Sequence, residues 1–225
     1  MLGVAAAVTA GSALLSYVLP PDYQALGVAA VFLGGAYVMV VRHDDAGLIR
    51  HFGLSLGGVV EPEPIDYRRL YGSSLKALGW ALLLAAIAFP PFWLGYVRWY
   101  EVAGPFIPAA PPALLDDVLG QLLVIALPEE AFYRGYLQTA ADDALGAKVK
   151  ILGARVGAGL LVTSALFALG HLATQPHPAR LAVFFPALVF GWLRARTGGI
   201  GASLTFHALC NLFADYLAQS YGLAP

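Results

Sequence analysis

Long runs of apolar residues, separated by short polar stretches, dominate this chain. The runs predict helices at residues 3–19, 24–41, 77–97, 114–137, 153–172, 181–193 and 200–218. A helix that crosses a bilayer needs roughly 20 mostly apolar residues, and most of these runs approach that length. The pattern therefore predicts an all-α fold, a polytopic membrane helix bundle of about seven transmembrane helices (six to eight), built as a single integral-membrane domain over residues 1–225.

The polar stretches predict where the chain turns and where it leaves the hydrocarbon. Pro20-Pro21-Asp22 separates the first two runs, and because proline cannot continue a helix, it predicts a tight helical hairpin. Residues 42–74 form the main polar segment. We expect this segment to lie outside the hydrocarbon, partly as an interfacial helix.

Lysine and arginine fall in alternate connections between the runs. They cluster after the second run, near the end of the fourth and after the sixth: Arg42, Arg50, Arg68, Arg69, Lys76; Arg134, Lys148, Lys150, Arg155; Arg194, Arg196. Arg98 and Arg180 fall on the other side. Because cytoplasmic loops carry an excess of positive residues, we predict a multi-pass protein of the cell's inner (cytoplasmic) membrane with its N-terminus in the cytoplasm. With seven spans, the C-terminus (Tyr221 to Pro225) then lies on the outer side of this membrane.

Composition agrees with a bilayer environment. The chain is 59% hydrophobic and 12% charged, with mean hydropathy +0.71, whereas soluble domains carry about 25% charged residues. The net charge of -1 provides no basic field for nucleic acid. A single cysteine, Cys210, rules out an intrachain disulfide framework and a Cys-based zinc site.

Two adjacent acids directly follow an apolar run, in Pro128-Glu129-Glu130-Ala131-Phe132-Tyr133-Arg134. A charge near the bilayer centre costs about 2.5–3.5 kcal/mol on insertion scales, so both acids need partners, protons or water. Glu130 and Arg134 are four residues apart on one helix face, which favours an ion pair. Glu129 points about 100° away and is free for another role.

Two more polar pairs lie in otherwise apolar helices. Phe167 with His171, and His207 with Asn211, each have the spacing of one helical turn. Together with Glu129 these side chains form a set that can hold a water, remove its proton and stabilise an oxyanion. Intramembrane ionisable groups favour a functional interpretation, although each histidine taken alone is more often a core residue.

The order Glu-Glu-x-x-x-Arg, Phe-x-x-x-His, His-x-x-x-Asn on successive membrane helices resembles the CAAX protease and bacteriocin-processing family (CPBP, also called Abi). The likeness covers roughly Leu114 to Leu217, within a catalytic core that we place at about 114–218. One segment also resembles the bacterial myxosortases, which are linked to removal of C-terminal sorting tails. Its sequence is Leu-Pro-Glu-Glu-Ala-Phe-Tyr-Arg-Gly-Tyr-Leu-Gln.

The resemblance implies a catalytic role for each motif residue. Glu129 is the general base on a water that His171 helps to activate, while His207 and Asn211 stabilise the oxyanion. Glu130 and Arg134 support the geometry of the site. No cofactor is then expected, although the same Glu and His side chains are also zinc ligands, so a zinc-dependent intramembrane metalloprotease stays an alternative.

The expected activity is hydrolysis of a peptide bond in a membrane-anchored protein substrate, at a terminal sorting, leader or lipidated segment. Its expected partners are this substrate and the lipid bilayer, and the oligomeric state stays open. Two alternatives belong to other classes. A proton-coupled transporter predicts interrupted helices in corresponding halves of the chain, and a non-catalytic membrane protein of the same fold predicts that Glu129 can be replaced without effect.

The predicted boundaries leave one conflict. They place His171 near the outer end of its helix, Glu129 near mid-membrane and His207 in the inner half of its helix. One shared site then requires one of two changes. Either the fifth helix begins later than residue 153, with residues 141–155 along the inner interface, or Gly170 marks a broken helix.

Overall fold

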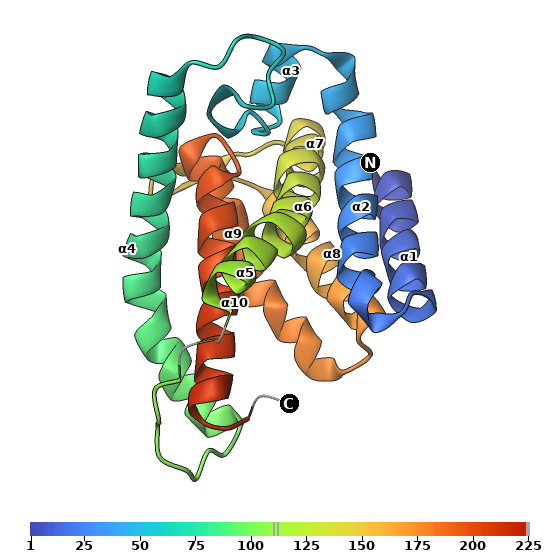
Figure 1. The fold of residues 1–225 in the computed structure, drawn as a ribbon. Coiled ribbons are helices and arrows are strands. Elements are labelled where there is room, and N and C mark those ends of the chain that lie inside the picture. The colour runs from blue at the N-terminus through green and yellow to red at the C-terminus, as the bar shows by residue number, and fades with distance from the viewer. Residues whose placement is uncertain (110, 112, 224–225) are drawn as a thin grey trace.

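The computed structural model describes residues 1–109, 111 and 113–223, which form a bundle of helices (Figure 1). The helices are α1 (Leu2–Val18), α2 (Pro21–Met39), α3 (Ala46–His51), α4 (Tyr67–Trp99), α5 (Leu114–Leu119), α6 (Leu127–Glu130), α7 (Gln138–Leu145), α8 (Ala158–Thr174), α9 (Phe184–Thr197) and α10 (Gly201–Ser220). Two π-helical segments, η3 (Gly120–Ala126) and η4 (Ala131–Leu137), join α5, α6 and α7 into one continuous helical segment. Short 3-10 turns are η1 (Val41–His43), η2 (Leu56–Gly58) and η5 (Pro178–Val183).

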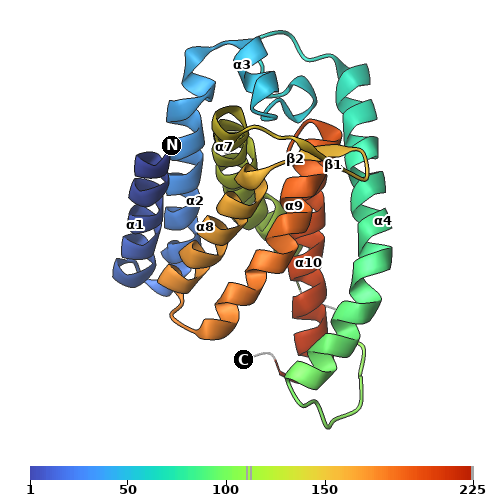
Figure 2. The same ribbon diagram turned by 180° about the vertical axis from the view of Figure 1, so that it is seen from behind.

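The segment from α5 to α7 runs through the middle of the bundle. Both side views place α4 at one edge and the α1–α2 hairpin at the other, with α5 to α7 between them (Figures 1 and 2). Helix α2 contacts η3, α6 and η4, while α10 contacts η3, α5 and α6 on the other side and packs along α4. The helix that carries Glu129 is therefore enclosed by the α1–α2 hairpin on one side and α10 on the other.

The predicted helices match observed ones, and the hairpin at Pro20-Pro21 is confirmed. By length and apolar character, three helices within the described residues qualify as membrane spans: Pro21–His43, Tyr67–Trp99 and Pro178–Thr197. Two shorter apolar helices are Leu2–Val18 and Ala158–Thr174. An all-α membrane-type bundle is thus the architecture of the chain, and the count of seven spans stays a prediction.

Helix α4 begins ten residues before the predicted start at residue 77, inside the segment expected to be polar loop. Asp66 explains the difference, because its side chain accepts hydrogen bonds from the backbone N–H groups of Arg68 and Arg69 and so caps the helix. The expectation of an interfacial element in this segment corresponds to the short helix α3, which Asp45 caps in the same way.

The segment that follows α7 differs from the prediction in two ways. The fourth helix continues to Leu145, beyond the predicted end at 137, and the fifth begins at Ala158 instead of 153. Between them the chain forms an antiparallel β-hairpin of β1 (Val149–Ile151) and β2 (Ala154–Val156), the one strand pair among the described residues. The strands are too short for the sequence pattern to separate them from a loop.

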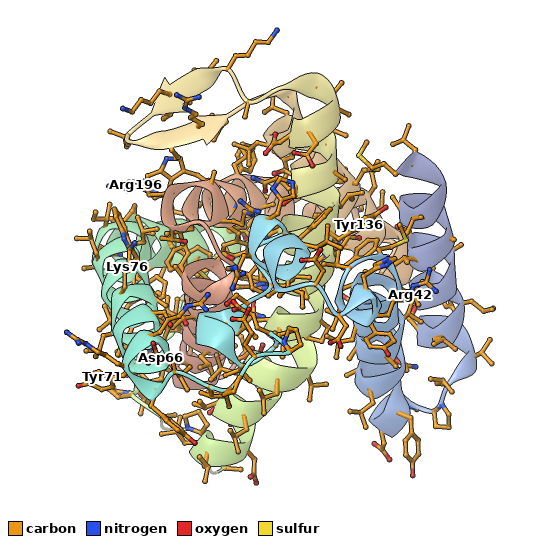
Figure 3. The ribbon with its side chains drawn as sticks, turned by 90° about the horizontal axis from the view of Figure 1, so that it is seen from above. Arg42, Asp66, Tyr71, Lys76, Tyr136 and Arg196 are labelled. Carbon is orange, nitrogen blue, oxygen red and sulfur yellow. The ribbon has the colours of Figure 1, made fainter. Side chains whose placement is uncertain are left out.

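Most basic residues gather at one end of the bundle. The connections α2–α4, α7–α8 and α9–α10 all lie toward this end, and Figure 3, which looks down on it, shows Arg42, Lys76 and Arg196 there. Arg134 is a correction to this pattern, because it is 1% exposed inside the bundle and is no loop residue. The C-terminal helix α10 ends at the opposite end, and residues 224–225 of the expected outer tail lie outside the described residues.

Glu61 holds the polar segment between α2 and α4 together. Its carboxylate accepts hydrogen bonds from Arg50 (2.7 Å), from Arg69 (2.6 and 2.8 Å) and from the Ser55 hydroxyl. The hydrogen bonds from Arg69, reinforced by Ser55 and by the charges of Arg69 and Arg50, lower the pKa of Glu61 to about 2, although burial opposes the shift. The carboxylate is therefore ionised in the folded protein across the physiological pH range.

Glu61→Gln should lower thermal stability, because removing a charged partner of this kind costs about 1–3 kcal/mol. The pKa of Glu61 falls from 4.5 to about 2 on folding. The ionised carboxylate therefore contributes its full stabilisation above pH 4.5, and this stabilisation is lost as the pH falls toward about 2. Unfolding midpoints of both proteins in detergent, measured between pH 7 and pH 3, should therefore converge at low pH. A constant gap between the two proteins across this range would contradict the role of the ionised carboxylate.

Candidate active site

The two adjacent glutamates lie on one helical turn, α6, between the two π-helical segments. Pro128 has no N–H and its ring crowds the preceding turn, which accounts for the wider π-helical turn before it. The Glu130 side chain is completely buried, whereas 14% of the Glu129 side chain is exposed. The predicted divergence of the two side chains is confirmed.

Glu130 is surrounded by two cationic or potentially cationic groups. Its Oε1 lies 3.7 Å from Arg134 Nε, as the spacing predicts, and 3.1 Å from His207 Nδ1 on α10. An ionised carboxylate can only accept hydrogen bonds, so His207 must carry its proton on Nδ1 in this contact. Glu130 thereby orients the His207 ring and ties α10 to the motif helix.

Aromatic rings fix the orientation of these charged groups. The His207 ring stacks on Phe190 with ring centroids 4.6 Å apart and planes inclined by 17°. The guanidinium carbon of Arg134 lies 4.2 Å from the ring centroid of Phe167 and 5.4 Å from that of Phe190. Cations over aromatic faces are stabilised electrostatically, so the same two rings support both side chains.

Held in this way, His207 directs its other nitrogen toward Glu129. His207 Nε2 lies 3.7 Å from Glu129 Oε2. The sequence offered Glu129 no cation on its own helix face, and the structure provides this histidine from α10 instead. Glu129 and His207 thus face each other in the wall of one cavity.

His171 contributes from α8. Its Nδ1 lies 3.0 Å from the backbone carbonyl of Phe167, one turn earlier in the same helix. A carbonyl oxygen accepts only, so Nδ1 carries the proton and the neutral ring has a free lone pair on Nε2. The His171 ring also packs against the Phe167 ring, with centroids 4.3 Å apart. His171 is therefore set up to accept a hydrogen bond through Nε2, as activation of a water requires.

Four of the six candidate residues line one cavity of about 430 Å³. These are Glu129, His171, His207 and Asn211, which come from three helical segments far apart in the sequence. Glu130 and Arg134 are buried behind the cavity wall and do not line it. The structure brings all six together and separates them into four cavity-lining side chains and two supporting ones.

His171, Glu129 and His207 line one cavity, although the predicted helix boundaries placed them at different depths. Helix α8 begins later than predicted, and it continues unbroken through Gly170 to Thr174. The expected break at Gly170 is therefore wrong. The glycine allows close packing instead, because a Cβ at that position would lie 2.7 Å from the Tyr133 hydroxyl oxygen. The alternative expectation, that the fifth helix begins later than residue 153, is correct. Residues 141–155 form the end of α7 and most of the β-hairpin.

Polar residues that the sequence did not single out as candidates also line this cavity, among them Gln121, Asp215 and Arg180. Gln121 Oε1 accepts a hydrogen bond from Asn211 Nδ2 (2.8 Å), and Gln121 Nε2 contacts Asp215 Oδ2 at 3.4 Å. Arg180 comes from η5. The sequence signal that could have identified Gln121 is its polar side chain at the start of an apolar run. Its contact with Asn211 depends on the packing of η3 against α10, which no local pattern shows.

The Glu and His side chains of the cavity are also of the types that bind zinc. Within the described residues, no three His, Cys, Asp or Glu side chains are grouped closely enough to hold a metal ion together.

The family model described as Type II CAAX prenyl endopeptidase Rce1-like matches residues 111–213. The matched range contains all six candidate residues and the complete cavity-lining set of Glu129, His171, His207 and Asn211. Comparison with curated proteins and with solved structures gives no match.

Arg134→Gln should destabilise the protein strongly, because breaking a buried ion pair leaves Glu130 with an uncompensated charge and costs about 3–5 kcal/mol. Glu129→Gln, in a side chain that faces the cavity, should change stability far less and is the matched control. The thermal unfolding midpoints of both variants in detergent provide the measurement. Equal midpoints for Arg134→Gln and wild type would show that Glu130 does not depend on this cation.

Proposed function

We propose that this chain, which through residues 111–213 belongs to the CPBP/CAAX protease family, is an intramembrane endopeptidase that uses a glutamate-activated water. The family supports CAAX-type protease activity at a membrane in general. One observation supports the specific mechanism: Glu129, His171, His207 and Asn211 converge on one cavity inside a helix bundle.

In the proposed reaction Glu129 accepts one proton of a water molecule while His171 Nε2 accepts a hydrogen bond from the other. The water oxygen then attacks the peptide carbonyl carbon. Glu129 subsequently delivers its proton to the departing nitrogen and the C–N bond breaks. The products are an amine and a carboxylic acid, which keeps the second proton of the water. General acid–base catalysis of this kind contributes roughly 10²–10⁴-fold to the rate.

The tetrahedral intermediate carries a negative oxygen that needs hydrogen-bond donors. The Nε2–H of a protonated His207 and an amide N–H of Asn211 are the proposed donors, since both side chains line the cavity beside Glu129. Glu130 accepts a hydrogen bond from Nδ1–H of His207, and Glu129 faces its Nε2, so the two carboxylates hold the ring in the orientation that this role needs. Glu130 and Arg134 are therefore proposed as positioning residues that act through His207.

A second cavity suggests how a membrane-anchored substrate reaches Glu129. This cavity, of about 300 Å³, is lined by α1, α2, η3, α6 and the end of α8. It shares five lining residues with the catalytic cavity: Val28, Phe32, Ile125, Glu129 and Thr174. A peptide that enters beside the α1–α2 hairpin would pass directly over Glu129. We propose that the substrate is a terminal sorting, leader or lipidated segment of a membrane-anchored protein. Removal of a C-terminal sorting tail, as in the myxosortases, is one form of this reaction. The proposed location is the inner membrane, with the N-terminus of the chain in the cytoplasm.

Glu129→Gln should abolish processing, with a fall in rate of roughly 10²–10⁴-fold, because the amide cannot accept the proton of the water. The measurement is the accumulation of the unprocessed membrane substrate in cells. Glu63→Gln, an exposed glutamate in the polar segment before α4, is the matched control and should process normally.

Normal processing by Glu129→Gln would overturn the mechanism and favour a non-catalytic membrane protein of this fold. A chelator test on purified protein separates the remaining alternative. Cleavage that persists in chelator supports metal-free hydrolysis, and cleavage that stops with chelator and returns with zinc supports the metalloprotease.

Asn211→Leu should lower the turnover rate by about 10²–10³-fold, the usual effect of losing one oxyanion donor. The substrate concentration for half-maximal rate should change little, because the donor acts in the transition state. Steady-state kinetics in detergent would measure both quantities. An effect confined to substrate affinity would assign Asn211 to binding instead.

A further inference from the structure

A cavity of about 540 Å³, larger than the catalytic one, lies at the basic end of the bundle. It is enclosed by the polar segment before α4, the first turns of α4, and the loop that leads from α9 into α10. Its lining shares no residue with the catalytic cavity. Neither the proposed reaction nor the family motifs use it.

The charged side chains that line this cavity are all positive. They are Arg50, Arg69 and Lys76, and the described lining contains no Asp or Glu. The hydroxyl group of Ser74, which also lines the cavity, adds a further hydrogen-bond donor. Such a set matches an anionic group with several acceptor oxygens.

Glu61 makes the arginine part of this wall rigid. Its side chain is 1% exposed and is not part of the lining, so the carboxylate lies behind Arg50 and Arg69 while holding both through hydrogen bonds. Guanidinium groups held in this way lose little conformational freedom when they bind a ligand. Lys76 forms no ion pair with the described residues and keeps its full charge available.

The N-terminus of α10 adds to the positive field. Gly201 and Ala202, in the first turn of this 20-residue helix, line the cavity. The helix has no side-chain cap and no acidic residue in its first turn. The first N–H groups of a helix lack intrahelical partners and carry partial positive charge, which favours an anion at this position.

The surface that continues from the cavity along α4 is apolar. Lys76 shares a helix face with Gly79, Leu83 and Ile87, each three or four residues further on. Leu83 is 52% exposed and Ile87 is 63% exposed, and a Cβ at Gly79 would meet open space. An anionic group in the cavity would thus be followed by an apolar strip directed into the predicted span.

We propose that this cavity binds the phosphate group of an anionic phospholipid, whose acyl chains lie along the strip Gly79, Leu83 and Ile87 of α4. The cation set recognises the phosphate, and the strip distinguishes a lipid from a soluble phosphate. The bound lipid would connect α4, the polar segment and the start of α10 at the membrane surface.

Lys76→Gln tests the proposal without disturbing the arginine pair on Glu61. Lys150→Gln is the matched control, because it removes the same charge from the exposed β-hairpin, away from the cavity. Purified full-length protein would be titrated with phosphatidylglycerol, phosphatidylcholine or inorganic phosphate, with bound lipid measured by native mass spectrometry and stability by thermal unfolding. Equal elution profiles of the three proteins would establish that both variants fold.

We expect phosphatidylglycerol to bind wild type and Lys150→Gln alike, and Lys76→Gln about fivefold more weakly, the effect of one basic charge near a membrane surface. Equal weakening by both substitutions would reveal non-specific attraction and overturn the site. Equal binding of phosphatidylcholine would overturn anionic specificity. Stabilisation by inorganic phosphate that phosphatidylglycerol does not match would identify a soluble ligand and overturn the lipid. Cleavage is not measured, so these results do not depend on the proposed protease activity.

Discussion

A fully buried carboxylate must be compensated inside the protein, because neither water nor lipid can solvate it. At Glu130 the compensation comes from Arg134 on the same helix and from His207 on α10. The two partners join the motif helix to the C-terminal helix at one point. Phe167 from α8 and Phe190 from α9 then close over the same charges. Four helical segments are thereby positioned around one buried charge, and the cavity beside it takes its shape from them.

The adjacent position has the opposite environment. Glu129 is one residue earlier, about 100° around the helix, and this rotation takes its side chain out of the buried cluster and into the cavity. The pair thus divides into a structural acid and a cavity acid without any difference in residue type. His207 connects them, since its two ring nitrogens face the two glutamates. Because Nδ1 is held by Glu130, Nε2 is the nitrogen that remains available to the cavity.

Helix α10 links the two ends of the functional surface. It begins at the basic cavity and reaches His207 six residues after Gly201, a distance of roughly 9 Å at 1.5 Å per residue. The charged groups at its start surround the basic cavity, while the histidine lies among buried rings. A membrane protein of this size has few places for charge, and this chain places a compensated cluster inside the bundle and a basic cavity at its end.

The sequence by itself determined the main helices and the six motif residues. Apolar runs and polar residues one helical turn apart are local features of the chain, and a helix that crosses a bilayer allows few exceptions to its apolar pattern. It also separated Glu129 from Glu130, since helix geometry alone sets that angle. The catalytic roles of these residues remain proposals. Four features were decided only by tertiary structure: the convergence of His171 with Glu129, the contact of Gln121 with Asn211, the burial of Arg134 and the basic cavity beside α4. Each depends on how helices distant in sequence tilt and pack against one another, and residue spacing along the chain carries no information about that tilt.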